Sequence, residues 1–390
     1  MPGFELIGKK EKEEINKIFN ESNGVLFAHG FEKLRRNIYR VRKFEKLVSK
    51  FLNVKYCLAT TSGTMAQYIA MKALGIKKGD QVITQAFTFV ATVEAILALG
   101  AEPIIINVDK TLNMDVQELK KTINSKTKLI IPVQMLGNQC KMKEISSIAK
   151  KNKIKVLEDS CEALGAKYLN KYVGTEGDMG IYSLDFAKTI TTGEGGLIVT
   201  NNKKLDKYCR EFHDHGHQNN TKRARGKDTR SFPGLNLRMT EIQAAIGIAQ
   251  IKKLKKIIKK NKENKKLLKK IIMQNNNVDF RKIVDEKGDL SDTLIFFLKN
   301  KKKAQQFSNI YSSKGFAIKN LPNAIDWHFA GTWRHMFAKK GRYKKNWKIK
   351  WKKTENLLER AIAIPIMVND SKKTIINRGK NINSIISKIL

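Results

Sequence analysis

Three short groups of residues in the first half of the chain have types and positions suited to chemistry. The first is Ser62-Gly63-Thr64, which follows a predicted strand and precedes a predicted helix. A helix N-terminus presents free N–H groups and the positive end of a dipole, and this arrangement suits a phosphate. The same three residues would also serve as an ordinary turn with a helix cap, so both interpretations stay open.

The second and third groups each follow a predicted strand. Residues 155–158 form an apolar strand that ends in the carboxylate of Asp159, which would otherwise cap the next helix. Lys188 lies between a strand that ends at Ser183 and a glycine-rich turn at residues 193–196. Most lysines are solvated surface charges, but a position between a strand end and a tight loop predicts a fixed, half-buried amine.

Together the three groups fit the needs of one cofactor, pyridoxal phosphate (PLP). PLP needs a lysine that forms a Schiff base, a carboxylate that keeps the pyridine nitrogen protonated, and a cradle for its phosphate. Lys188, Asp159 and residues 62–64 supply these in turn. The sequence therefore predicts a PLP enzyme in which Lys188 and Asp159 are catalytic.

At several places in the same order, the chain resembles the DegT/StrS-type sugar aminotransferases, which share the fold-type I architecture of PLP enzymes. The resemblance covers residues 4–253 and includes the segments 62–64, 75–80, 87–92, 158–159, 188–196, 215–216 and 234–245. The family uses glutamate to place an amino group on a keto or aldehydo sugar. The resemblance therefore implies a PLP-dependent sugar aminotransferase with glutamate as donor.

The resemblance also implies roles for residues that the chemistry alone does not single out. Phe89 would stack on the pyridine ring, with core packing as its ordinary alternative. Ser183 would join Gly63 and Thr64 around the phosphate. Asn236 would reach the phosphate of the neighbouring subunit, with a loop cap as its alternative. A shared phosphate site implies a homodimer with shared active sites.

Two positions depart from the family pattern. Glu162 stands where the family has Gln or His, at a place expected to touch the cofactor ring. A carboxylate there would alter the local proton balance. Leu237 stands where the family has Tyr, so an aromatic contact is lost. Neither departure removes a residue that transamination requires.

The substrate stays open between two anionic sugars. Residues 1–8, 213–220 and 327–331 are similar to aminotransferases that make 8-amino-3,8-dideoxy-octulosonate, a lipopolysaccharide sugar, from 8-oxo-3-deoxy-octulosonate. Most members of the family instead use nucleotide-linked keto-deoxyhexoses. One enzymatic alternative is a sugar 3-dehydratase of the same family, but those enzymes carry His at the position of Lys188.

The elements that must position these residues alternate between strands and helices. Strands are predicted at 55–60, 81–84, 102–108, 128–133, 155–158, 180–183 and 196–200, with helices such as 64–74, 89–99 and 142–151 between them. This alternation predicts an α/β fold with a mostly parallel sheet sandwiched by helices. Such a sheet binds ligands beyond the carboxyl ends of its strands.

Two domains are predicted. Residues 1–250 would form a large PLP-binding α/β domain with an N-terminal arm, and residues 251–390 a long connecting helix with a small C-terminal α+β domain. Thr240 and Gln243 form a capping box that opens the long helix at residue 241. The helix is predicted to end at about Ile272, and the Asn-rich residues 274–277 after it mark a boundary.

The formal charge of +40 raises a nucleic-acid partner as an alternative. The densest basic stretches are Lys252 to Lys270 and Lys339 to Lys353. In the first, apolar residues recur at helical spacing, which predicts that the lysines form a solvated helix face. The second interleaves lysines with Tyr343, Trp347 and Trp351, and aromatics at this spacing usually face a core. We therefore favour solvated surface, or a site for an anionic sugar, over nucleic-acid binding and regulation without turnover.

The remaining features concern the cellular compartment of the protein. The four cysteines are scattered, without a pair or a histidine cluster at metal-ligand spacing, which predicts reduced thiols and no metal site. No apolar run approaches the roughly 20 residues that cross a bilayer, and the first residues are charged. We expect a cytoplasmic protein without a membrane partner.

Overall fold

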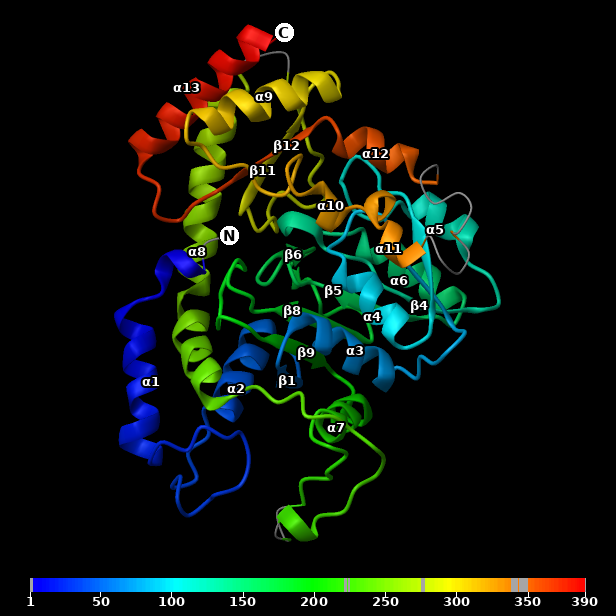
Figure 1. The fold of residues 1–390 in the computed structure, drawn as a ribbon, viewed down its shortest axis with the longest axis vertical. Helices are drawn as coiled ribbons and strands as arrows, with labels where there is room; N and C mark the ends of the chain where they lie inside the picture. The colour runs from blue at the N-terminus through cyan, green and yellow to red at the C-terminus, as the bar shows by residue number, and fades with distance from the viewer. Residues whose placement is uncertain are drawn as a thin grey trace.

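The computed structural model describes residues 3–220, 223, 225–274, 278–337, 343 and 350–389. A seven-stranded sheet lies at its centre, with helices on both faces (Figure 1). From one edge to the other, the strands are β1 (Tyr56–Thr60), β9 (Gly196–Thr200), β8 (Met179–Ser183), β5 (Lys155–Asp159), β4 (Thr127–Ile130), β2 (Gln81–Gln85) and β3 (Glu102–Ile106).

The sheet is parallel except at β9, which runs antiparallel to both β8 and β1. This arrangement confirms the predicted α/β class. Strand β4 ends at Ile130 instead of the predicted residue 133, because Pro132 has no N–H to donate to the ladder. The chain still stays beside β5 there, since Asp159 N–H donates to the Pro132 carbonyl (3.0 Å).

Alternating side chains of the strands enter two separate cores. Leu58, Leu157 and Ile181 belong to the core under α3 (Gly63–Ala73) and α4 (Ala91–Ala98). Residues on the opposite face meet the remaining helices of this layer, which are α2 (Arg40–Leu52), α5 (Val116–Thr122), α6 (Met142–Lys151) and the first half of α8 (Glu241–Ile272). Every strand is thus buried on both faces, as parallel sheets require.

The other elements of the first 240 residues flank this sandwich. They are η1 (Phe4–Leu6), α1 (Lys9–Ser22), η2 (Met135–Gly137), the hairpin of β6 (Lys167–Tyr168) and β7 (Lys171–Tyr172), α7 (Lys203–Phe212) and η3 (Arg225–Lys227). Helix α1 packs along α8. Most predicted boundaries hold within a few residues; α4 begins at Ala91, two residues after the predicted start.

Helix α8 leaves the large sheet and continues into a second, smaller layer (Figure 1). Its N-terminus is the predicted capping box of Thr240 and Gln243. The smaller layer holds the antiparallel sheet β10 (Asp279–Phe280), β11 (Thr293–Phe297) and β12 (Ala361–Pro365), with α9 (Lys301–Ser313) and α13 (Lys372–Ile389) packed against it. The short helices α10 (Ile325–His328), η4 (Ala330–Thr332), α11 (Arg334–Phe337) and α12 (Lys352–Leu358) return to the large sheet.

The basic stretches behave mostly as solvated faces. In Lys252 to Lys270, the apolar residues Leu254, Ile257 and Leu268 are buried and most lysines are exposed or half-buried. Lys265 is the exception, because it is buried in an ion pair with Asp289 (2.6 Å). In the second stretch, Tyr343 and Trp351 are buried in the core, while residues 339–342 and 344–349, with Trp347, lie outside the described residues.

Two further features concern the protein's surroundings. All four cysteines are free thiols. Among the helices within the described ranges, none combines the length and the apolar character needed to span a bilayer.

Residues 275–277, most of the Asn-rich stretch predicted to follow the long helix, lie outside the described ranges.

Candidate active site

The predicted site residues gather at one edge of the large sheet because their strands are parallel. Asp159 ends β5 and Ser183 ends β8. Ser62 follows β1, and Phe89 follows β2. Carboxyl ends of parallel strands lie along a common edge, and this edge is where doubly wound sheets bind ligands. The topology therefore brings together residues as far apart in sequence as Ser62 and Ser183.

Lys188 lies half-buried at this edge and faces a carboxylate. Its Nζ is 3.7 Å from Oε1 of Glu162, and its side chain is 15% exposed. Burial lowers the pKa of Lys188, but the negative groups around it, Glu162 first, outweigh this effect and raise the pKa above its usual value. The backbone of Lys188 is also held, because its carbonyl accepts a bond from Gly3 N–H of the N-terminal arm (3.1 Å). The prediction of a fixed amine is consistent with this geometry.

Glu162 is buried in the middle of positive charge. Burial raises its pKa, but Lys188, His328 and Lys319 together outweigh burial and lower the pKa below its usual value. Its Oε2 accepts a hydrogen bond from Leu136 N–H (3.1 Å). Glu162 is therefore an anion at neutral pH, paired with the lysine.

Asp159 is a buried carboxylate with hydrogen bonds on both oxygens. Oδ2 accepts from the Thr92 hydroxyl (2.9 Å), and Oδ1 accepts from Cys161 N–H (3.2 Å). Burial raises its pKa, and the bonds from Cys161 and Thr92 oppose that rise. No cation of the described ranges lies within ion-pair distance of it. Residues 160–166 form turns, so the alternative that Asp159 caps a helix is wrong.

Ser62, Gly63 and Thr64 open α3, as predicted. The Ser62 Oγ accepts from Met65 N–H (3.2 Å), so this serine does cap the helix. The N–H groups of Gly63 and Thr64 belong to the first turn and have no acceptor within the helix. A methyl group at Gly63 would lie 2.9 Å from the Ser183 Cβ and 3.2 Å from the Cys161 Sγ, so Gly63 packs directly against these two side chains.

Gly196, at the start of β9, packs against the same turn. A Cβ at Gly196 would lie 2.1 Å from the Ser62 carbonyl oxygen, which is impossible without moving the backbone. Only glycine therefore lets the start of β9 approach the Ser62 turn so closely. The close packing of the helix N-terminus, β8 and β9 depends on these two glycines and on the small side chain of Ser183.

Phe89 projects from the turn before α4 and is 40% exposed, so core packing is the wrong interpretation for it. It lies parallel to Trp327, with ring centroids 6.2 Å apart. Two backbone hydrogen bonds fix this turn. The Trp327 carbonyl accepts from Val90 N–H (2.9 Å), and the His328 carbonyl accepts from Thr88 N–H (3.0 Å). The C-terminal part of the chain thus holds the aromatic ring at the site's edge.

Asn236 is exposed, and its side chain makes no hydrogen bond within the part of the chain that the structure describes. The neighbouring Leu237 carbonyl accepts from Thr61 N–H (3.1 Å), which places this segment beside the Ser62 turn. An unengaged amide on a fixed backbone is available to a second subunit.

Sequence analysis missed Thr92, His328 and Lys319 as site residues. Thr92 lies in segment 87–92, which carries the family resemblance, so a hydroxyl there was a usable signal for a partner of Asp159. His328 lies in segment 327–331, whose resemblance to one group of aminotransferases was the only signal for it. Lys319 had none, because nothing in the local sequence separates it from the other lysines. In addition, no group of three or more metal-binding side chains occurs among the described residues.

Comparisons with known proteins show which family this chain resembles. A GDP-perosamine synthase of Escherichia coli O157:H7 is 41% identical over 233 residues, which cover 60% of this chain and 63% of that protein. A 3-oxo-glucose-6-phosphate:glutamate aminotransferase of Bacillus subtilis is 38% identical over 216 residues, covering 55% of this chain and 47% of that protein. The matched part thus spans about half to two thirds of these relatives' lengths.

The fold extends this likeness over the whole chain. A GDP-4-keto-6-deoxymannose-3-dehydratase, solved with a trapped PLP-glutamate geminal diamine, superposes with a TM-score of 0.82 at 22% identity, covering 97% of this chain and 98% of that one. The likeness establishes the predicted fold-type I architecture. The sequence profile of the DegT/DnrJ/EryC1/StrS aminotransferase family matches residues 29–378. The chain belongs to the DegT/DnrJ/EryC1/StrS aminotransferase family.

Proposed function

We propose that this protein is a PLP-dependent aminotransferase that moves an amino group from glutamate to a keto or aldehydo sugar. The observation that carries the proposal is the position of Lys188, a half-buried amine 3.7 Å from Glu162 at the carboxyl edge of a fold-type I sheet. A lysine in this place is what a transaminase needs and what a binding protein without turnover does not.

The residues present fit the cofactor. Gly63, Thr64 and Ser183, with Ser62 capping the helix, offer a cradle for the phosphate. Asp159 is a buried anion without a cationic partner in the described chain, and a protonated ring nitrogen would be that partner. Phe89 offers an exposed ring face for stacking. When bound, PLP supplies the electron sink that lets the bond between Cα and hydrogen of an amino acid break.

The chain's own residues then do three things. Lys188 anchors the cofactor and, once released, carries the proton between the donor's Cα and the cofactor. Glu162 holds the lysine's ammonium form beside the reacting atoms. Asp159, fixed by Thr92 and Cys161, keeps the ring nitrogen charged throughout.

For the substrate, we propose an anionic keto or aldehydo sugar used for lipopolysaccharide or another surface polysaccharide. The printed names of the relatives include a synthase of a GDP-linked amino sugar and an aminotransferase that uses glutamate, and both support this class. Both 8-oxo-3-deoxy-octulosonate and a nucleotide-linked keto-deoxyhexose fit it. The cytoplasm is the compartment we expect, because it keeps free cysteines reduced.

We further propose a homodimer whose active sites are shared through Asn236. The exposed amide beside the Ser62 turn supports this. We assign residues 1–250 to the PLP-binding domain and residues 251–390 to the connecting helix and the small domain, because the second sheet has its own core.

A sugar 3-dehydratase is the main enzymatic rival, since such an enzyme shares the fold. The presence of Lys188, where those enzymes carry His, favours transamination. A basic regulatory protein that keeps the fold without turnover is the second rival. Incubating the purified protein with PLP, glutamate and a panel of keto and aldehydo sugars, followed by product mass spectrometry, separates all three. An amino sugar with stoichiometric 2-oxoglutarate supports the proposal, whereas a deoxy sugar or no product contradicts it.

A further inference from the structure

The turn Met135–Gly137 holds Glu162 by both its side chain and its backbone. Leu136 N–H donates to Oε2 (3.1 Å), and Gly137 N–H donates to the Glu162 carbonyl (3.2 Å). Leu136 has φ 50° and ψ 48°, a left-handed conformation that a leucine keeps only when its surroundings impose it. The direction of the Leu136 N–H, and with it the position of Oε2, therefore depends on what fixes this turn.

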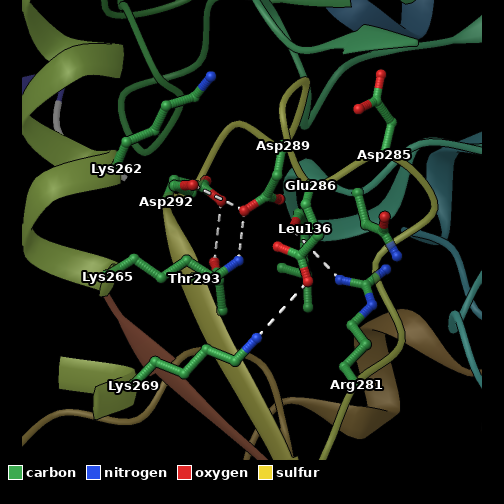
Figure 2. A network of polar contacts seen from close by, with 12 residues as sticks. Leu136, Lys262, Lys265, Lys269, Arg281, Asp285, Glu286, Asp289, Asp292 and Thr293 are labelled. Atoms are coloured by element: carbon green, nitrogen blue, oxygen red, sulfur yellow. Dashed lines mark hydrogen bonds and ion pairs between the residues drawn. The ribbon is translucent and has the colours of Figure 1, made fainter. Parts of the chain in front are cut away.

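Arg281 also fixes this turn. Its guanidinium donates to the carbonyl of Leu136 (3.3 Å), which lies beside it in Figure 2. It donates as well to the carbonyls of Met135 (2.7 Å) and Thr111 (2.7 Å). The side chain is 5% exposed, and it has no ion-pair partner within the described ranges. Burial lowers its pKa to about 10, so it stays charged at neutral pH. Asp289, Asp292 and Glu162 attract its charge without forming an ion pair with it, and its three hydrogen bonds go to backbone carbonyls, so its direct effect is on the course of the backbone.

We propose that Arg281 is a positioning residue that holds the Glu162 carboxylate against Lys188 through the turn at Leu136. The inference rests on the proposed role of Lys188 and adds a residue from the C-terminal part of the chain to that site.

The charges around Glu162 explain why the orientation of its carboxylate has to be fixed by a hydrogen bond. Lys188, His328 and Lys319 all attract it, from three different segments. Burial lowers the pKa of His328, so the cations at neutral pH are the two lysines, and a carboxylate between two lysines of different segments has more than one favourable orientation. The bond from Leu136 N–H fixes Oε2 and leaves Oε1 facing Lys188. Lys188 in turn faces Glu162, Cys161, Asp185 and Asp159, so Glu162 is its main but not its sole negative neighbour.

The experiment measures the pKa of Lys188 in the cofactor-free, full-length protein. Competitive acetylation across a pH series, read by peptide mass spectrometry, reports the fraction of neutral amine at this lysine. Glu162→Gln should lower the pKa of Lys188 by about 1 to 3, the effect expected of an opposite charge at this distance. Arg281→Lys keeps the positive charge but cannot reach three carbonyls at once, so it should lower the same pKa by roughly 0.5 or more.

The matched control is Lys265→Met. Lys265 lies in α8 and pairs with Asp289 (2.6 Å), and it makes no hydrogen bond to the turn at Leu136 (Figure 2). It should leave the pKa of Lys188 within about 0.3 of the parent value, on the scale of charge effects for distant groups. A double variant, Glu162→Gln with Arg281→Lys, should match Glu162→Gln alone.

Three results would overturn the proposal. In the first, Arg281→Lys leaves the pKa of Lys188 unchanged while Glu162→Gln lowers it. In the second, Lys265→Met shifts this pKa as much as Arg281→Lys does. In the third, the double variant shifts it further than Glu162→Gln alone. If Arg281→Lys does not fold, Arg281→Gln replaces it; loss of the positive charge by itself would raise the pKa of Lys188, so a lowered pKa still reports the loss of the bonds to the turn. Because the readout needs no PLP, a failed cofactor assignment and a failed positioning role give different results.

Discussion

The Thr92 hydroxyl donates a hydrogen bond of 2.9 Å to Oδ2 of Asp159. Thr92 lies in α4 and Asp159 ends β5, so the bond joins a helix to the carboxyl edge of the sheet. With the bond from Cys161 N–H, it fixes both oxygens of a buried carboxylate. These two bonds favour the ionised form that a protonated pyridine nitrogen needs opposite it, although burial still holds the pKa of Asp159 above its usual value.

Asp159→Asn should therefore reduce kcat/KM for transamination by more than tenfold, or about 1.4 kcal/mol of barrier. An amide cannot keep the ring nitrogen protonated, so the electron sink is lost. Thr92→Val is the matched control, because it removes one hydrogen bond but leaves the carboxylate; we expect a loss of about 0.5 to 1.5 kcal/mol. Equal losses in the two variants, or a loss below tenfold for Asp159→Asn, would place the function of Asp159 elsewhere.

Lys188→Ala should abolish transamination and leave the fold and noncovalent PLP binding largely intact, since the phosphate and ring contacts remain. Lys203→Ala, at an exposed position in α7, should behave as the parent. Steady-state rates measure transamination, circular dichroism checks the fold, and equilibrium dialysis measures PLP binding. Near-normal turnover by Lys188→Ala would contradict the assignment of the anchoring lysine.

The shared-site proposal predicts complementation between two impaired chains. Asn236→Ala should weaken PLP binding by about 1 to 3 kcal/mol, the range for removing one buried partner of a charged group. In a mixed dimer of Asn236→Ala and Lys188→Ala chains, one site carries both lesions and the other carries neither. Activity should return as subunits exchange. If native mass spectrometry shows exchange without recovered activity, Asn236 acts within its own chain.

Two buried histidines predict a loss of stability in mild acid. Burial lowers the pKa of His29 to about 3 and that of His213 to about 4. The unfolded chain binds these protons near pH 6.5, so the free energy of unfolding should fall as the pH drops from about 6.5 towards 4. The slope should approach 1.4 kcal/mol per pH unit for each imidazole.

Urea unfolding at fixed protein concentration, at about pH 7, 6 and 5, measures this loss. His213→Asn should flatten the dependence by removing one titrating group. The nearby Asp214 has a lowered pKa and contributes only below its unfolded value of about 3.8, outside this window. Equal free energies of unfolding at pH 7 and 5 would show that these histidines are charged in the folded protein.

Much of the fold could be predicted because it depends on local pattern. Strand β9 and helices α6 and α8 match their predicted bounds, since apolar periodicity, the Thr240 capping box and flanking polar residues mark them. The gathering of Ser62, Asp159 and Lys188 followed from the topology of a parallel sheet. These predictions needed only the order of elements along the chain.

The remaining parts of the site depend on distant contacts. Arg281 reaches Leu136 across 145 positions, and the bond needs a left-handed leucine that no local signal reveals. Lys265 looks like its solvated neighbours in sequence, yet Asp289 makes it a buried partner. The strand end at Ile130 was predicted too late because the apolar run continues through Pro132. Local pattern could not supply any of these.

The most direct test of the whole account is to locate the cofactor. The full-length protein is incubated with PLP, treated with borohydride, digested and mapped by mass spectrometry, with Lys188→Ala in parallel. We expect a phosphopyridoxyl group on Lys188 in the parent, none on that peptide in the variant, and loss of the label when glutamate is added before the borohydride. A label spread over surface lysines, or fixed on another lysine and insensitive to glutamate, would contradict the proposed active site.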